Sequence, residues 1–285
     1  MKQIQALFAA VLCGVLSSVA VNASAQSGHP GYATVIRVQG IVSYSLGDAN
    51  WHPLLAGKYL PVGAILRTGD NGVVDVVLGK SVDVSQAAWQ PDRIGFAPDS
   101  PVRGMISYKP ASEQNVVRLL PETTMAIDKL NITDTSADTV SDTELNLKKG
   151  KIFCSVKKLT GASEYLIKLP NGIAGVRGTR FSISANGDVA CFESTGGGVV
   201  LSLVQADGIT KTFVVTPGQA LDVTTGQLGQ IQADLNTQLS NFFNAIQTIY
   251  LRVAAFIPGG DSTRCYISPV HGGSGGHGHG HGKGV

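Results

Sequence analysis

The segment Gly172–Phe181 reads GIAGVRGTRF and places three glycines around Arg177, a combination that can bind an anion. Glycine-rich turns let backbone N–H groups approach a phosphate, and arginine recognises phosphate or carboxylate through two N–H groups at once. A phosphate cradle also needs a helix after the loop, whereas residues 181–187 alternate between apolar and polar types and predict a strand. We therefore interpret the segment as a structural lock between strands, in which Arg177 binds carbonyls or a carboxylate of neighbouring turns. Anion binding is the alternative.

Side chains of the kind used in catalysis are few. His29 and His52 are the only histidines before the tail, and the GGSGG at 272–276 satisfies G-x-S-x-G without the strand and helix that would strain its serine. Asp75 and Asp83 could face the same way across a hairpin, but alternating acids on a strand are usually its solvated face. No catalytic motif is assembled, so the sequence predicts a protein that is not an enzyme and has no cofactor.

Cysteine positions suggest a role in the core. Cys154 and Cys191 each share strand parity with apolar neighbours, so both are expected to point toward the apolar face. In an oxidising compartment the two could form a disulfide, and two separate core thiols are the alternative. Cys265 is then left without a partner in the sequence.

The C-terminal tail, 259–285, is rich in glycine and histidine and is expected to be disordered. Neutral imidazoles are good ligands for divalent transition metals, and glycine leaves the chain supple. The tail therefore predicts either a solvated spacer or weak metal binding. The candidate ligands are His277, His279 and His281.

The first residues predict export. Lys2 precedes an almost entirely apolar run from 7 to 21, and Ala23-Ser-Ala25 is a typical signal-peptidase site, so residues 1–25 are interpreted as a signal peptide. No later segment has the length of apolar residues needed to span a membrane. The chain has 22 basic and 20 acidic residues, a balance that argues against nucleic acid as a partner. We expect a periplasmic or extracellular bacterial protein.

Short alternating segments separated by turn residues predict an all-β domain at 34–225, after an N-terminal extension at 26–33. Four prolines lie between 85 and 115, which we interpret as a loop-rich insertion. The polar stretch 133–144 is expected to be another exposed loop.

A different period begins after the β-region. Apolar residues from Leu228 to Phe256 recur at steps of three and four, which predicts an amphipathic helix within 226–258. Its apolar stripe has two interpretations. The helix could pack back onto the β-domain, or residues 228–257 could mediate self-association or docking to a protein partner. The stripe consists of Leu228, Ile231, Leu235, Leu239, Phe242, Ile246, Ile249, Val253 and Phe256.

Several short motifs follow one another between about 34 and 225. They are Val38–Gly40, Leu54–Gly57, Leu60–Gly63, Leu66–Asp70, Leu147–Gly150, Ile173–Thr179 and Pro217–Gln219. The most specific residues are Gly175, Val176, Arg177, Gly178, Thr179 and Phe181. In this order the motifs resemble the FecR-type domain, the extracytoplasmic β-domain of FecR-like sigma-regulator proteins. The resemblance implies a twisted β-solenoid or roll-like fold rather than a two-sheet sandwich. The chain departs from the sigma regulators because a signal peptide replaces their cytoplasmic anti-sigma segment and membrane helix.

These observations lead us to expect an exported, non-catalytic FecR-like protein that acts as a cell-envelope scaffold or interaction module. Self-assembly through the C-terminal helix is part of this expectation. One alternative is a protein that binds peptidoglycan or another cell-wall glycan through exposed aromatics such as Trp51, Tyr59 and Trp89. Another is an accessory to envelope signal transduction that acts through a separate membrane partner.

Overall fold

The structure is a computed structural model, and it describes residues 28–48, 50–79, 107–134, 139–205 and 207–253. The signal peptide at 1–25, most of the insertion at 85–115, Trp89, Asp83 and the tail with its histidines and Cys265 lie outside the described residues.

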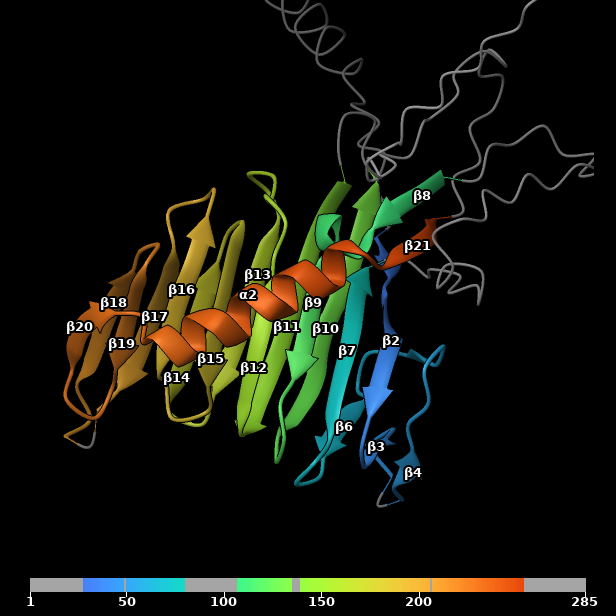
Figure 1. The fold of residues 1–285 in the computed structure, drawn as a ribbon, viewed down its shortest axis with the longest axis horizontal. Coiled ribbons are helices and arrows are strands. Elements are labelled where there is room, and N and C mark those ends of the chain that lie inside the picture. The colour runs from blue at the N-terminus through green and yellow to red at the C-terminus, as the bar shows by residue number, and fades with distance from the viewer. Residues whose placement is uncertain (1–27, 49, 80–106, 135–138, 206, 254–285) are drawn as a thin grey trace, which may run out of the picture.

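The described chain forms two large sheets that face each other (Figure 1). The ten-stranded sheet has the order β18 (Thr210–Val215), β17 (Val199–Val204), β14 (Gly172–Val176), β13 (Glu164–Leu169), β11 (Thr139–Lys149), β10 (Thr124–Asp134), β6 (Ile65–Thr68), β3 (Val42–Ser45) and β4 (His52–Pro53), with β1 (His29–Pro30) paired to β10. The nine-stranded sheet has the order β20 (Gln227–Gln230), β19 (Gln219–Asp222), β16 (Val189–Ser194), β15 (Thr179–Ser184), β12 (Lys151–Ser155), β9 (Asn115–Leu119), β7 (Val73–Gly79), β2 (Tyr32–Gln39) and β5 (Tyr59–Leu60).

The chain passes back and forth between the two sheets as it advances along the molecule. After β12 it adds β13 and β14 to the ten-stranded sheet, β15 and β16 to the nine-stranded sheet, and then β17 and β18 to the ten-stranded sheet again. The expected all-β class with a C-terminal helix is confirmed, and the sheets do not close. The chain winds like a roll, but its strands form two sheets that face each other. The resemblance implied a fold other than a two-sheet sandwich, so this two-layer arrangement was not expected.

The main core lies between the sheets and is built by alternation along each strand. In β17, Val199, Leu201 and Leu203 are buried between the layers, whereas Val200 and Val204 point outward and are exposed. This period of two follows from the pleat, which directs successive side chains to opposite faces.

The expected loop at 133–144 is wrong over 133–134, which end β10, and over 139–144, which begin β11, while 135–138 lie outside the described residues. β10 and β11 pair antiparallel over almost their whole length, and β11 pairs parallel with β13. Ser141 and Thr143 occupy buried positions in line with Leu145. Buried and less buried positions alternate along β11 as in the other strands, but its first buried positions carry hydroxyl side chains. The composition of the segment is therefore that of a solvated loop.

The C-terminal helix, α2 (Ala233–Gln247), is shorter than the expected 226–258. Leu228 lies in β20 opposite Leu221, and residues 250–253 form β21 (Tyr250–Val253), which pairs with β8 (Ser107–Pro110). Pairing with neighbouring strands outweighs the helical period at both ends. Gly226 and Gly229 also weaken any helix before α2.

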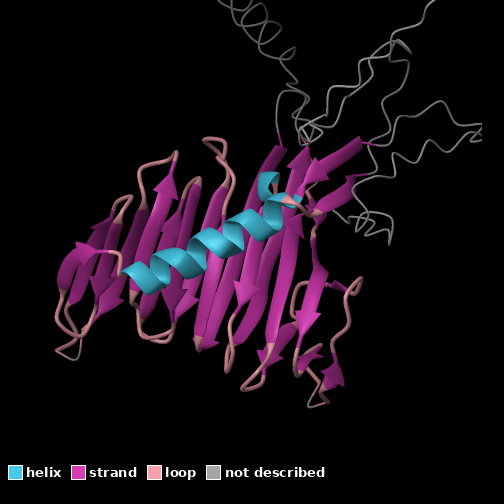
Figure 2. Ribbon diagram, in the orientation of Figure 1, coloured by secondary structure: helices cyan, strands magenta, loops and turns pink. Residues whose placement is uncertain are grey.

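Helix α2 crosses the outer face of the nine-stranded sheet (Figure 2). Its buried residues, Leu239, Phe242, Phe243 and Ile246, form a second core with Ile36, Val77, Val116 and Phe153 from that sheet. Within the described residues, no helix is long and apolar enough to cross a membrane. The expected insertion ends in β8 and the short 3-10 helix η2 (Ala111–Glu113), which contacts α2.

Candidate functional site

The GVRGT segment is the crossing from one sheet to the other. Val176 ends β14 in the ten-stranded sheet and Thr179 begins β15 in the nine-stranded sheet, so Arg177 and Gly178 alone make the connection. Gly178 has a φ of 69°, in the left-handed region that favours glycine. Val176 and Phe181 enter the main core on either side of the crossing. The segment therefore joins the two layers over two residues.

Arg177 lies at the surface and contacts the turn before β13. Its Nη2 donates to the carbonyl of Gly161 at 2.7 Å and to that of Thr160 at 3.4 Å. These are carbonyls of a neighbouring turn, the kind of partner that a structural lock would use. Because the guanidinium is exposed, each hydrogen bond replaces one to water and contributes little net stability.

Sequence reasoning missed the loop that wraps this crossing. A Cβ atom added at Gly196 would lie 1.6 Å from the carbonyl oxygen of Arg177, so only glycine fits there. Ser194 Oγ accepts from the N–H groups of Gly196 and Gly198 at 3.1 and 2.9 Å and lies 3.1 Å from Thr179 Oγ1. The run of three glycines at 196–198 is the signal that could have indicated a close backbone approach.

Gly175 does not need to be glycine for steric reasons. An added Cβ would meet only Leu166 at 3.8 Å and the carbonyl oxygen of Val200 at 4.0 Å, both ordinary contacts. A close approach or a positive φ therefore requires glycine at position 178 and not at position 175. Gly175 instead faces outward in the ten-stranded sheet, between Val200 and Leu166 in register.

Cys154 and Cys191 are both buried and both free, so the structure does not contain the proposed disulfide. Cys154 and Cys191 each pair with Phe181, which lies between them on β15. Two strand spacings separate them, roughly 9.5 Å, whereas a disulfide needs Cα atoms within about 7 Å. Burial raises the pKa of Cys191 to about 11 and raises that of Cys154 further, so both remain core thiols.

Asp75 is not on a solvated face, contrary to our interpretation of the alternating acids. Its side chain is fully buried between two arginines on adjacent strands (β2 and β9). Arg118 donates from Nε and Nη2 to the two carboxylate oxygens at 2.6 and 2.9 Å, and Arg37 Nη2 lies 2.6 Å from Oδ2. Burial raises the pKa of Asp75 to about 7, and the charge and hydrogen bond of Arg37 oppose that rise.

Helix α2 covers this arginine–aspartate group. The guanidinium carbon of Arg118 lies 4.4 Å from the centre of the Phe242 ring, and that of Arg180 lies 5.4 Å from the Phe243 ring. Phe153 and Phe192 pack against the same two rings, at 5.9 and 5.2 Å between ring centres. The group is thus part of how the helix is attached to the nine-stranded sheet.

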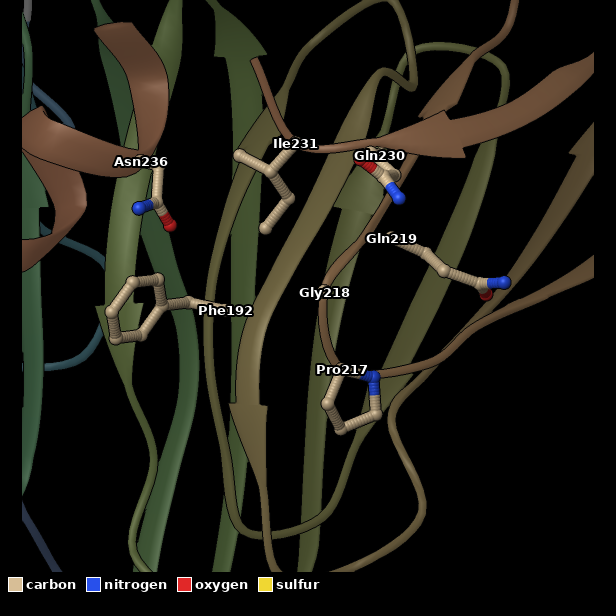
Figure 3. A pocket seen from close by; sticks show the side chains of 7 residues that line it. All are labelled: Phe192, Pro217, Gly218, Gln219, Gln230, Ile231 and Asn236. Atoms are coloured by element: carbon tan, nitrogen blue, oxygen red, sulfur yellow. The ribbon is translucent and has the colours of Figure 1, made fainter. Parts of the chain in front are cut away.

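One pocket of about 520 Å³ lies where α2 begins, between the helix and the last strands of the nine-stranded sheet. Figure 3 shows Phe192, Ile231 and Asn236 on one side of it and Pro217 and Gln219 on the other. Its lining residues are Phe192, Pro217, Gly218, Gln219, Gln230, Ile231 and Asn236. Because none of these side chains titrates, the pocket offers amide hydrogen bonds and an aromatic ring but no acid or base.

Other candidate chemistry does not come together in the described part of the chain. His29 and His52 are exposed and lie in separate two-residue strands. Among the described residues, no group of three or more His, Cys, Asp or Glu side chains is placed to hold a metal ion.

The outer face of the ten-stranded sheet carries exposed apolar residues. Val214, Val200, Gly175 and Leu166 lie in one row across β18, β17, β14 and β13, and Glu144 on β11 continues the row. Val200 and Val214 are 46% and 50% exposed. Lys168 forms an ion pair with Glu144. We call the row from Val214 to Leu166 the apolar row. Its valines and leucine flank the position of Gly175, which has no side chain.

Residues 110–200 match the family model described as FecR protein, which confirms the expected resemblance for about a third of the chain, including the GVRGT crossing. No curated protein matches the sequence. Two crystal structures of a candidate anti-sigma factor from Parabacteroides distasonis align with 16% identity and TM-scores of 0.29 and 0.28. Each alignment covers 47% of this chain and 58% of that chain, and likeness at this level carries no argument about fold or function.

Proposed function

We propose that this chain is an exported, non-catalytic FecR-type protein that works as a protein-interaction module in signalling at the bacterial cell envelope. The match of residues 110–200 to the FecR family supports a regulatory protein on the envelope side of the membrane. The signal-peptide pattern at 1–25 supports export. The partner is proposed to bind the apolar row on the ten-stranded sheet.

The observation that carries this proposal is the difference between the two outer faces. Helix α2 buries four apolar side chains on the nine-stranded sheet, whereas Val200, Val204 and Val214 stay about half exposed on the ten-stranded sheet. Valines gathered on one face of a β-sheet are more typical of a contact surface than of a solvated one. The missing side chain at Gly175 leaves room for a partner group between Val200 and Leu166.

The C-terminal helix is not proposed as the contact. Leu239, Phe242 and Ile246 from the expected stripe are buried against the chain's own sheet, so they are not available to a second copy or a partner. Packing onto the β-domain, the other interpretation of the stripe, accounts for them.

Glycan binding receives less support. Trp51 precedes β4 in the ten-stranded sheet and Tyr59 lies in β5 of the nine-stranded sheet, so the two do not share a sheet surface. The guanidinium carbon of Arg67 lies 3.9 Å from the centre of the Trp51 ring, which occupies one face of that ring. Metal binding by His277, His279 and His281 stays a proposal about the tail.

The test is complementation in the producing cell. Deleting the gene should change transcription of a defined set of genes, and the wild-type chain should restore it. A chain with Val200→Lys and Leu166→Lys should fold but fail to restore transcription, because charges replace the apolar groups on both sides of Gly175. The matched control is Val62→Lys, since Val62 is exposed to 39% and lies outside the apolar row.

Two results would contradict the proposal. Full complementation by the Val200→Lys, Leu166→Lys chain would exclude the apolar row as the contact. An unchanged transcript profile after deletion would exclude a signalling role and favour a purely architectural one.

A further inference from the structure

One end of the molecule leaves both sheets open. β18 is the last strand of the ten-stranded sheet and β20 is the last of the nine-stranded sheet, and both lie at the left end in Figure 1. Within the described residues, each of these strands pairs on one side only. Their outer edges therefore present backbone N–H and C=O groups that can pair with another strand.

The opposite end is built differently. The sheets end there in β4 and β5, which have two residues each, and β4 contains Pro53. Leu54 and Leu60 are 2% and 0% exposed and close the core at that end. Very short strands and proline are the devices by which natural sheets avoid edge-to-edge pairing.

The open end exposes side chains that point into the space between the sheets. Leu228 on β20 faces the same side of its sheet as Leu221, its partner in register, yet Leu221 is 2% exposed and Leu228 is 45% exposed. On the other sheet, Phe213 pairs with the fully buried Leu201 and is itself only half-buried. The core thus ends with apolar side chains uncovered on both layers.

The edge strands also lack the usual protection. β20 reads QLGQ and carries no charge, and β18 reads TKTFVV with Lys211 as its single charge. Neither strand contains proline. Charged residues and proline at an edge normally prevent another strand from adding to it.

From these observations we infer that the open end binds a second copy of this chain, end to end. A partner must offer two strand edges at the spacing of packed sheets, about 10 Å, together with apolar groups that continue the core. The open end of a second copy supplies all of these. Such a contact is isologous, with a twofold axis perpendicular to the sheets that pairs β18 with β18 and β20 with β20, each antiparallel.

The charges permit this pairing. Residues that lie directly opposite each other on two antiparallel strands have side chains on the same face of the sheet. The twofold axis therefore passes beside one residue of β18, which lies opposite the same residue of the second copy. With the axis at Thr212 or at Phe213, Lys211 lies opposite Phe213 or Val215 of the other copy. Neither register places two lysines opposite each other, which would be unfavourable.

The experiment is sedimentation equilibrium of the full chain across a concentration series. The wild type should form a dimer, and Leu228→Glu should be monomeric, because a charge would replace an apolar group in the contact. Leu55→Glu is the matched control, since Leu55 is 72% exposed away from the open end, and it should dimerise like the wild type. A monomeric wild type, or a dimer that survives Leu228→Glu, would overturn the inference.

Hydrogen exchange of the wild type keeps the inference falsifiable if Leu228→Glu fails to fold. Amides in 210–215 and 227–230 should become more protected as concentration rises, while those in 52–60 should not change. Amides at the open end that exchange at the same fast rate at every concentration would show that the edges face solvent. Protection there that is independent of concentration, and is lost when 254–285 are removed, would show that the chain's own C-terminal segment covers the edges. The outer-face contact proposed above is independent, since a Val200→Lys, Leu166→Lys chain, whose changes lie on β17 and β13 and not on an edge strand, should still dimerise.

Discussion

Arg177 contacts the neighbouring turn from an exposed position, so its effect on stability should be small. Replacing it by alanine removes two hydrogen bonds to carbonyls that water can then reach. We expect Arg177→Ala to lower the free energy of unfolding by about 0.5–1.5 kcal/mol, measured by urea denaturation. Lys149→Ala, which breaks an exposed ion pair with Glu122, is the control and should cost less than about 0.5 kcal/mol. A loss above about 3 kcal/mol would show that Arg177 acts as a buried lock.

Asp75 should contribute more to the free energy of unfolding than Arg177 does, because its carboxylate is fully buried. Asp75→Asn keeps the shape of the side chain but leaves the largely buried Arg118 without its carboxylate, and it also removes the carboxylate partner of the more exposed Arg37. We expect a loss of about 2–4 kcal/mol in the free energy of unfolding. Glu193→Gln, in an exposed pair with Arg180, is the control and should cost less than about 1 kcal/mol. Equal effects of the two substitutions would argue against a structural role for the buried group.

At the scale of elements, α2 acts as a cover for the nine-stranded sheet. A β-sheet that is apolar on its outer face needs something to bury that face, and a helix with one apolar side can do so. Val77, Val116 and Phe153 supply the apolar surface, and the aromatic rings of Phe242 and Phe243 lie over it. Truncation at Thr225 would remove α2 and expose this second core, so we expect the truncated domain to be less stable than the full chain.

Phe242 tests that role directly. Its side chain is fully buried against Phe153 and Arg118. Phe242→Ala should lower the free energy of unfolding by about 3–5 kcal/mol, through lost burial and a cavity. Asn244→Ala, on the exposed side of the same helix, should stay within about 0.5 kcal/mol in the same measurement. If both variants have wild-type stability, the helix is not attached to the sheet in solution.

In the GVRGT crossing, a few residues fix how β14 and β15 are connected between the two sheets. Gly178 turns the chain between layers, while Val176 and Phe181 anchor the two strands in one core. The loop at 196–198 then lies against the crossing, and glycine at 196 avoids contact with the Arg177 carbonyl. A segment that looks like an anion site by composition is here the shortest path between two sheets.

At the scale of the whole molecule, the fold is asymmetric in two ways. One outer face is covered by α2 and the other keeps the apolar row, and one end is closed by Leu54 and Leu60 while the other is open. These two differences place the proposed partner contact on a face and the inferred self-association on an end. The two contacts can therefore be removed separately, by Val200→Lys with Leu166→Lys and by Leu228→Glu.

The sequence by itself determined the secondary structure class, most strand positions and the apolar face of the helix. Alternation at period two and steps of three and four are local properties, set by the pleat and by the helical turn. Leu239, Phe242 and Ile246 could be assigned to one face of a helix because their spacing alone requires it. The FecR-type motif could be read for the same reason, since its residues are adjacent in the chain.

Only the tertiary structure decided which of these residues meet. Burial of Asp75 depends on Arg37 and Arg118, which arrive from other strands, and the separation of Cys154 from Cys191 depends on β15 lying between them. The ends of the helix depend on the pairing of β20 with β19 and of β21 with β8. Each of these contacts joins segments through strand order, and strand order is set by the free energy of the whole core rather than by any local pattern.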